Sequence, residues 1–516
     1  MLILHYQQFL AELELNFKTN KMKKNIIIAI LAGLTLTGCD KDYLDVNPSE
    51  FITPEQASEV AEYDPSIYNG FLNGVYSTMY TPEVGGTTGD DDFGQKGIDI
   101  YTDMLTGDMA LSRSSYGWYR TLTQLTETVD FTRNSNYVPW RYYYRIVFGA
   151  NTVIKAQGGN DVQPETEDAQ HVLGQAKALR AYGHFYLQQL FAKEYIANEK
   201  SVPIKLSVDD NSLPKSTSQE VMAQVIKDLE EAIVLLDGFD RPNKTPINQD
   251  VAKALAAYAY AYVGDATSLA KARDYAKDVA DNSGATILTS SEAVGGMNNV
   301  SSNSWLWGVD LTTDMGFDLV SFFGQIDYYT YSYQWAGDRK AIDAGLYAQI
   351  KANDIRKTQF NGTVASTSSL YLIPFQKFYD PAREVGGQRN ISTDICHLRV
   401  EEMYLLYAEC AAKTGQETEA RTYLKMLLSN RFANPADYAY VDALAATALQ
   451  NEIYLQTRIE LWGEGKTYLA LKRNKKSVTR GTNHLSHVGT TMQYNDPRFT
   501  FSIPQAEVIN NPNLNK

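Results

Sequence analysis

Cysteine is scarce in this 516-residue chain, which contains three. Cys39 ends an apolar run near the start, whereas Cys396 and Cys410 lie fourteen positions apart in or beside a helical pattern. On one continuous helix that spacing is about 21 Å, and a disulfide needs Cα atoms within roughly 7 Å of each other. We therefore predict that Cys396 and Cys410 are reduced core residues. No cysteine cluster typical of a metal site is present.

Positively charged residues are fewer than negatively charged ones. The chain has 47 lysine and arginine residues against 61 aspartate and glutamate residues, and its formal net charge is -14. Proteins bind nucleic-acid backbones through clustered lysine and arginine, and anionic lipid surfaces attract basic segments. We therefore expect no nucleic-acid partner. We also expect the body of the protein not to adhere to an anionic membrane.

Apolar runs long enough to cross a bilayer are absent. Residues 26–34 form a short apolar run behind a basic start, against the roughly 20 residues that a membrane span needs. This pattern predicts a secretion signal over residues 22–38 and makes residues 1–21 a spurious extension. Residues 36–39, Leu-Thr-Gly-Cys, resemble the lipobox of bacterial lipoproteins and predict lipid on Cys39. The alternative is an ordinary signal peptide with an incidental cysteine.

Apolar residues recur three or four positions apart through much of the chain, as in amphipathic helices. Ala408 and Ala420 are small residues on consecutive predicted helices, with Gly415 between them, which is typical of a tetratricopeptide repeat. We predict a mainly α, tetratricopeptide-repeat helical scaffold, and a generic helical bundle is the alternative. The predicted helices cover residues 172–195, 219–236, 251–263, 270–280, 401–413, 418–429 and 449–472.

Two blocks, residues 80–138 and 282–379, lack helical periodicity and are rich in glycine, hydroxyl and aromatic residues. The second contains strand-like runs at 305–309, where the tryptophans fit a core strand, and at 370–373. Long irregular segments in a compact domain are usually functional. We therefore predict irregular loop-rich and short β insertions on the helical scaffold, within a single unit over residues 39–516.

Six short motifs, in order along the chain, together resemble the SusD/RagB family of outer-membrane nutrient-binding lipoproteins. Two departures are Ala470, where the family often has aspartate, and residues 195–198, which replace a common Tyr-Gly-Gly turn. The resemblance implies an N-terminal SusD-like part over about 40–240 and a RagB/SusD C-terminal part over about 290–516. The motifs lie at 39–48, 140–154, 176–182, 458–473, 501–507 and 511–514.

The resemblance also implies a function. The resemblance implies that the protein binds a glycan at the outer membrane, facing the cell exterior. It also implies that the protein delivers the glycan to a SusC-like TonB-dependent transporter. It implies binding rather than catalysis. One alternative is a scaffold that binds a peptide or another nutrient in the same uptake complex. A second is a lipid-anchored glycoside hydrolase, which would need two carboxyl groups roughly 5 to 10 Å apart; no residue pair here carries a hydrolase motif.

Sugars present C–H faces and hydroxyl edges, so a glycan binder needs flat aromatic side chains flanked by polar groups. Tyr329, Tyr331, Tyr333 and Trp335 alternate with polar residues. In an extended chain these four aromatic side chains would share one face. We interpret the segment as a binding platform. The alternative is a strand whose aromatic face packs into the core.

A second aromatic stretch contains Tyr116, Trp118 and Tyr119 beside serine and glycine. It predicts an exposed loop tip, or alternatively a loop anchored by buried aromatic residues. Asp92, the last of three consecutive aspartates, is a further candidate for ligand binding. Three consecutive acids cannot all face one point, so we expect no cofactor there, although a structural calcium ion is the alternative.

Overall fold

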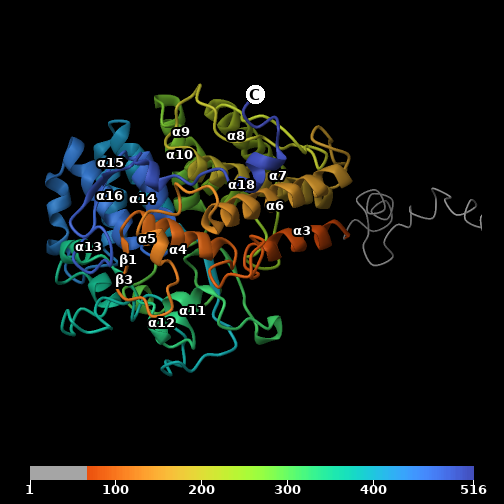
Figure 1. The fold of residues 1–516 in the computed structure, drawn as a ribbon. Helices are drawn as coiled ribbons and strands as arrows, with labels where there is room; N and C mark the ends of the chain where they lie inside the picture. The colour runs from red at the N-terminus through yellow and green to blue at the C-terminus, as the bar shows by residue number, and fades with distance from the viewer. Residues whose placement is uncertain (1–66) are drawn as a thin grey trace, which may run out of the picture. The chain divides into compact units, whose positions relative to one another are not determined.

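Helices form most of the regular structure over residues 67–516, the part of the chain that the computed structural model describes (Figure 1). The predictions for residues 1–38 and for lipid on Cys39 lie outside this part. The predicted mainly helical fold is confirmed. The longer helices are α3 (Ile67–Thr78), α4 (Gln95–Leu105), α6 (Asn134–Ala156), α7 (Glu167–Phe191), α8 (Ser218–Leu235), α9 (Gln249–Val263), α10 (Ala266–Asn282), α14 (Val400–Lys413), α15 (Glu417–Leu428), α16 (Ala446–Glu460) and α17 (Lys466–Arg473).

Several of these helices begin at residues that cap them. The Thr166 side chain accepts a hydrogen bond from the Ala169 backbone N–H at the start of α7. Thr217 and Glu220 form a reciprocal capping box at the start of α8. Such side chains satisfy backbone donors that have no partner within the helix. Local sequence therefore fixes where these helices start.

Helices that follow each other in the sequence pack side by side, as α6 with α7, α7 with α8, α9 with α10, and α14 with α15. Ala408 in α14 and Ala420 in α15 are fully buried, and Gly415 between them adopts a φ of 79°. Small residues at these positions let the two helices approach closely. The arrangement matches the tetratricopeptide scaffold that the sequence predicts.

The irregular block between α10 and α14 lies together below the helices in Figure 1. It contains the short helices α11 (Phe322–Ile326), α12 (Tyr333–Ala336) and α13 (Ala344–Gln349). In the described part of the chain, three two-stranded antiparallel ladders accompany the helices. They are β1 (Met109–Leu111) with β3 (Lys340–Ile342), β2 (Trp305–Val309) with β4 (Ile395–Arg399), and β5 (Ser477–Thr479) with β6 (Thr491–Gln493).

Two sequence predictions about strands have different outcomes. Trp305 and Trp307 lie in β2 and are buried, as expected for a core strand. The predicted strand at 370–373 is wrong, because these residues form turns and Leu372 has a φ of 60°. Leu372 and Ile373 are nevertheless buried. Burial, rather than strand pairing, explains their apolar character.

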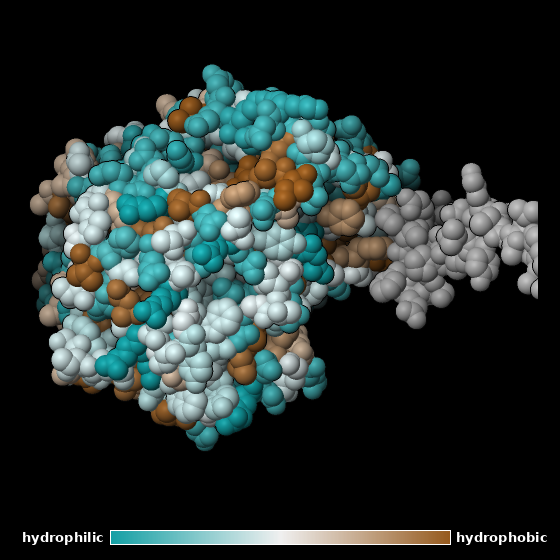
Figure 2. Space-filling model, in the orientation of Figure 1, coloured by the Kyte–Doolittle hydropathy of each residue, from teal (hydrophilic) through white to brown (hydrophobic). Residues whose placement is uncertain are grey.

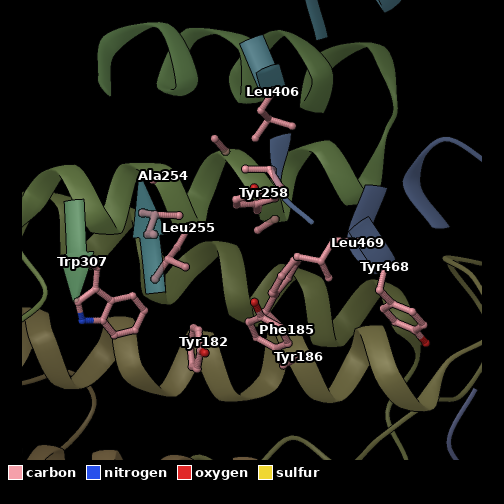
Figure 3. Close-up of a cluster of buried hydrophobic side chains, with 14 of the residues drawn as sticks. Tyr182, Phe185, Tyr186, Ala254, Leu255, Tyr258, Trp307, Leu406, Tyr468 and Leu469 are labelled. Atoms are coloured by element: carbon pink, nitrogen blue, oxygen red, sulfur yellow. The ribbon is translucent and has the colours of Figure 1, made fainter. Parts of the chain in front are cut away.

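The core joins segments that are far apart in the sequence (Figure 3). Tyr182 of α7 packs edge-on against Trp307 of β2, with ring centroids 5.4 Å apart. Tyr258 of α9 and Tyr468 of α17 are buried in the same cluster. Cys396 and Cys410 are buried and unpaired, as predicted.

The predicted long helix over 449–472 is wrong, because it is divided into α16 and α17. Gly463 and Gly465, between the two helices, have φ values of 79° and 74°. A Cβ at Gly463 would lie 2.6 Å from the Phe378 ring, and one at Gly465 would lie 2.2 Å from Asp99 Oδ1. Close packing at this bend therefore requires glycine, which also permits positive φ.

The surface in Figure 2 is mostly hydrophilic, with hydrophobic side chains in separate patches. The exposed apolar residues include Phe148 on α6 and Ile509 on α18 (Gln505–Asn510). Within residues 67–516, no helix is both long enough and apolar enough to cross a bilayer.

Candidate functional site

The β1–β3 ladder brings the two predicted aromatic stretches together, although they are more than 200 residues apart (Figure 1). Leu111 pairs with Lys340 in the antiparallel register. The pairing continues past the strands, since the Ser112 N–H donates to the Arg339 carbonyl at 2.8 Å and the Arg339 N–H donates to the Arg113 carbonyl at 2.9 Å. The chain after β1 therefore runs beside the chain before β3.

Asp338 fixes the loop that carries the first stretch. Its buried carboxylate accepts three backbone hydrogen bonds, from Ser115 at 2.5 Å, Tyr116 at 2.9 Å and Trp118 at 3.1 Å. A carboxylate that accepts several N–H groups is well satisfied without a cation. The loop's conformation is thus set by a residue that closely follows the other stretch.

Tyr116, Trp118 and Tyr333 form the centre of the site, which we call the aromatic cluster. The Tyr116 and Tyr333 ring centroids are 5.6 Å apart, and those of Trp118 and Tyr333 are 5.7 Å apart, both edge-to-face. Tyr116 is 65% exposed, and the other two rings are half-buried. Three rings from two distant segments therefore reach the same surface.

Tyr331 and Trp335 extend the aromatic surface. Their ring centroids are 5.0 Å apart with a tilt of 34°, and both side chains are half-buried. Gly386 lies against Trp335, because a Cβ there would be 2.7 Å from the indole ring. Trp335 is therefore partly covered by the loop that carries Gly386.

The predicted extended conformation of this segment is wrong, since Tyr333–Ala336 form the short helix α12. The alternative of an aromatic face buried in the core does not hold for Tyr331, Tyr333 and Trp335 either. The intervening polar residues are the buried ones, namely Thr330, Ser332 and Gln334. Gln334, for example, donates to the Lys340 carbonyl at 3.0 Å and accepts from the Lys340 N–H at 2.7 Å.

Three predicted ligand-binding residues do not reach the surface: Asp92, Tyr119 and Tyr329 are buried. The Asp92 carboxylate accepts hydrogen bonds from the Gly85 and Thr87 N–H groups at 2.8 and 3.0 Å. Tyr119 packs against Tyr101, with ring centroids 5.6 Å apart. Asp92 and Tyr329 therefore support the site from beneath, whereas Tyr119 also lines the polar hollow beside Trp118.

A polar hollow of about 450 Å³ adjoins Trp118. Residues that the sequence analysis did not single out line it, including Asp91, Tyr101, Glu127 and Asn134. Tyr101 donates its hydroxyl to Asp91 at 2.5 Å, and burial raises the pKa of Asp91 to about 6. The aspartate run at 90–92 was the available signal, but it does not reveal which carboxylate faces the hollow.

The three consecutive aspartates face different partners, as expected for adjacent residues. Asp90 accepts from the Tyr333 hydroxyl, Asp91 from Tyr101, and Asp92 from the backbone of residues 85–87. Over residues 67–516, no group of three or more His, Cys, Asp or Glu side chains is arranged to hold a metal ion.

Comparison with protein families gives two matches. Residues 85–262 match a family model described as starch-binding and associating with the outer membrane. Residues 322–516 match the model of the SusD family. A SusD-like protein, P25, from Formosa agariphila is 23% identical over 214 residues. That stretch covers 41% of this chain and 38% of the relative.

Solved structures share the fold. A SusD-like carbohydrate-binding protein from Bacteroides vulgatus has a TM-score of 0.71 at 22% identity, covering 87% of this chain and 96% of its own. A SusD superfamily protein from Bacteroides thetaiotaomicron has a TM-score of 0.69 at 20% identity, covering 87% and 98%. A structure described with a xylogluco-oligosaccharide has a TM-score of 0.59 at 17% identity, covering 86% and 98%.

Proposed function

Because this chain belongs to the SusD/RagB family, we propose that it binds a glycan at the cell surface and delivers it to a membrane transporter. The observation that supports this proposal is the aromatic cluster beside the polar hollow. Tyr116 and Trp118 come from one segment and Tyr333 from another, so the folded chain creates a surface that neither segment has alone.

The two parts of the site suit the two kinds of sugar surface. Exposed aromatic rings pack against the C–H faces of a sugar, and their burial on binding is favourable. Asp91, Glu127 and Asn134 line the hollow and offer acceptors or donors to hydroxyl groups. A glycan lying over Tyr116 and Trp118 would place hydroxyls toward these side chains.

We further propose a SusC-like TonB-dependent transporter as the protein partner and lipid on Cys39 as the membrane anchor. The family match and the lipobox-like residues 36–39 support this location. Cell-surface exposure on the outer membrane follows from the same reasoning. A ligand held on the irregular face would leave the helical scaffold free to contact the transporter.

Glycan hydrolysis is the alternative that the hollow itself suggests, because Asp91 and Glu127 both line it. Both carboxylates accept hydrogen bonds from neighbouring hydroxyls, Asp91 from Tyr101 and Glu127 from Thr121 and Ser135. They are thus engaged as acceptors within the fold. We expect bound glycan to be recovered intact, and release of reducing ends during the binding assay would instead support a hydrolase.

The proposal is tested by affinity electrophoresis of the signal-free protein against a panel of soluble polysaccharides. Tyr116→Ala and Trp118→Ala should each weaken binding about 5- to 30-fold, as expected for truncating an aromatic side chain at the centre of an interface. Phe148→Ala is the matched control, because Phe148 is 57% exposed but lies on α6.

Retention of full affinity by both cluster variants would place the ligand elsewhere. Absence of binding across the panel would count against a glycan and favour a peptide or another nutrient. Melting temperatures of all three variants, measured alongside, separate lost contacts from lost folding.

A further inference from the structure

Arginine side chains gather beside the aromatic cluster although the protein is acidic. Arg113 and Arg339 lie at the end of the β1–β3 ladder, and Arg383 and Arg389 lie in the loop that reaches Trp335. Over residues 67–516, none of the four forms an ion pair with a carboxylate. We call these four residues the arginine strip.

The backbones of Arg113 and Arg339 lie side by side, and neither side chain forms an ion pair among the described residues. The Arg339 N–H donates to the Arg113 carbonyl at 2.9 Å. Arg339 is only 8% exposed; its Nη1 donates to the Gln334 carbonyl, and its buried Nε has no hydrogen-bond partner. Burial, with the neighbouring Arg113, lowers the pKa of Arg339. Two adjacent like charges are costly, and a bound anion would relieve that cost.

Arg383 and Arg389 lie flat on aromatic rings. The Arg383 guanidinium is 4.4 Å from the Tyr379 ring centroid and 5.1 Å from that of Tyr329. The Arg389 guanidinium is 3.9 Å from the Tyr331 ring centroid. Both arginines are exposed. Stacking fixes the plane of a guanidinium. Arg383 Nη2 donates to the Tyr329 hydroxyl at 3.1 Å and to the Phe375 carbonyl at 3.4 Å, which leaves its other N–H groups for an oxyanion.

None of the neighbouring carboxylates forms an ion pair with the arginine strip among the described residues. Asp338 is occupied by three backbone N–H groups. Asp327 is buried and accepts from the Tyr329 N–H, the Thr330 hydroxyl and the Asp380 N–H. Burial raises the pKa of Asp380. Glu384 is exposed next to Arg383, and no ion pair joins the two within the described residues.

From this arrangement we infer that the glycan is anionic, and that its carboxylate or sulfate groups bind the arginine strip while its sugar rings contact the aromatic cluster. This inference rests on the proposed function and adds the charge of the ligand to it. Guanidinium groups recognise carboxylate and sulfate oxygens through paired N–H donors. Uronate residues and sulfate esters are two sources of that charge in polysaccharides.

The test compares matched polymers in affinity gels and calorimetry. One pair is a polyuronate and its carboxyl-reduced form, and the other is a sulfated galactan and its desulfated form. We expect one anionic polymer to bind at least tenfold more tightly than its neutral counterpart, and its affinity to fall as salt is raised. The pair that shows the difference identifies the source of the charge.

Arg113→Gln and Arg383→Gln should each weaken binding of the anionic polymer about tenfold or more, since each removes a charged hydrogen-bond donor. Arg141→Gln is the matched control, because Arg141 is exposed on α6 and makes no ion pair among the described residues. Unchanged melting temperatures would show that the variants fold.

Equal affinity for charged and neutral members of both pairs, with unaffected arginine variants, would overturn the anionic ligand while leaving glycan binding in place. Binding of an anionic polymer that the arginine variants do not weaken would overturn the role of the strip. Absence of binding to all four polymers and to the wider panel would overturn both proposals.

Discussion

At the scale of single residues, hydrogen bonding decides which side chains of the site face outward. Thr330 donates to Asp327 at 2.8 Å, and Ser332 donates to the Leu319 carbonyl at 2.8 Å. These polar side chains satisfy groups that would be costly to bury unpaired. The neighbouring Tyr331 and Tyr333 are consequently left nearer the surface. Residue polarity alone would assign the opposite orientation.

Asp338 offers a direct test of how the site is held. Asp338→Asn replaces one acceptor oxygen by an amide donor that faces backbone N–H groups. We expect the free energy of unfolding to fall by about 1–3 kcal/mol and glycan affinity to fall with it, because Tyr116 and Trp118 lose their fixed loop. Urea unfolding and affinity gels measure the two effects. Asp314→Asn, at an exposed position, should change neither, and a stable Asp338→Asn protein with full affinity would refute the argument.

Asp91 gives a pH prediction. Burial raises its pKa from 3.8 to about 6 in the folded protein. Between these values the folded state binds more protons than the unfolded state, so the contribution of Asp91 to stability decreases as pH rises from about 4 to about 6. Asp91→Asn does not titrate. Its free energy of unfolding should therefore rise by about 2–3 kcal/mol relative to that of the wild type as the pH is raised across that range. Urea unfolding of both proteins at pH 4, 5, 6 and 7 measures this gain, and a constant difference would contradict the shift.

At the scale of elements, buried ion pairs join helices and strands that are distant in sequence. Arg399, at the end of β4, pairs with Glu460 of α16 at 2.8 Å and with Glu464 at 2.8 Å. Arg458 of α16 pairs with Asp108, just before β1, at 2.5 Å.

Arg399→Met should therefore destabilise the protein strongly. It leaves Glu460 and Glu464 buried with one partner fewer, and breaking a buried pair costs about 3–5 kcal/mol. Thermal or urea unfolding checks this. Arg421→Met is the comparison, because its i,i+4 pair with Glu417 is partly exposed and should cost less than about 1 kcal/mol. Similar losses of unfolding free energy in the two variants would show that burial does not control how much an ion pair contributes to stability.

At the scale of the whole molecule, the described chain combines a helical scaffold with an irregular block that carries half of the site. β1 lies between α4 and α6, β3 lies between α12 and α13, and the two strands pair directly. The binding surface thus depends on both parts of the sequence. The membrane anchor is a separate feature, proposed on Cys39.

Cys39→Ala should abolish incorporation of a radiolabelled fatty acid and remove the protein from the outer-membrane fraction. Two acyl chains are needed for stable anchoring, and the other two cysteines are buried and cannot replace Cys39. Labelling followed by membrane fractionation measures both effects, with Cys396→Ala as a control that keeps its label. Labelling of Cys39→Ala would contradict lipidation at this position.

The sequence by itself determined the fold class and the two aromatic stretches, because helical periodicity, capping residues and local composition are properties of neighbouring residues. Tertiary structure decided that the stretches meet through β1 and β3, that Asp92, Tyr119 and Tyr329 are buried, and that Asp91 faces the hollow. It also divided the last helix at Gly463 and Gly465. These outcomes depend on contacts and hydrogen bonds between residues hundreds of positions apart, and no local pattern encodes which of those residues will meet.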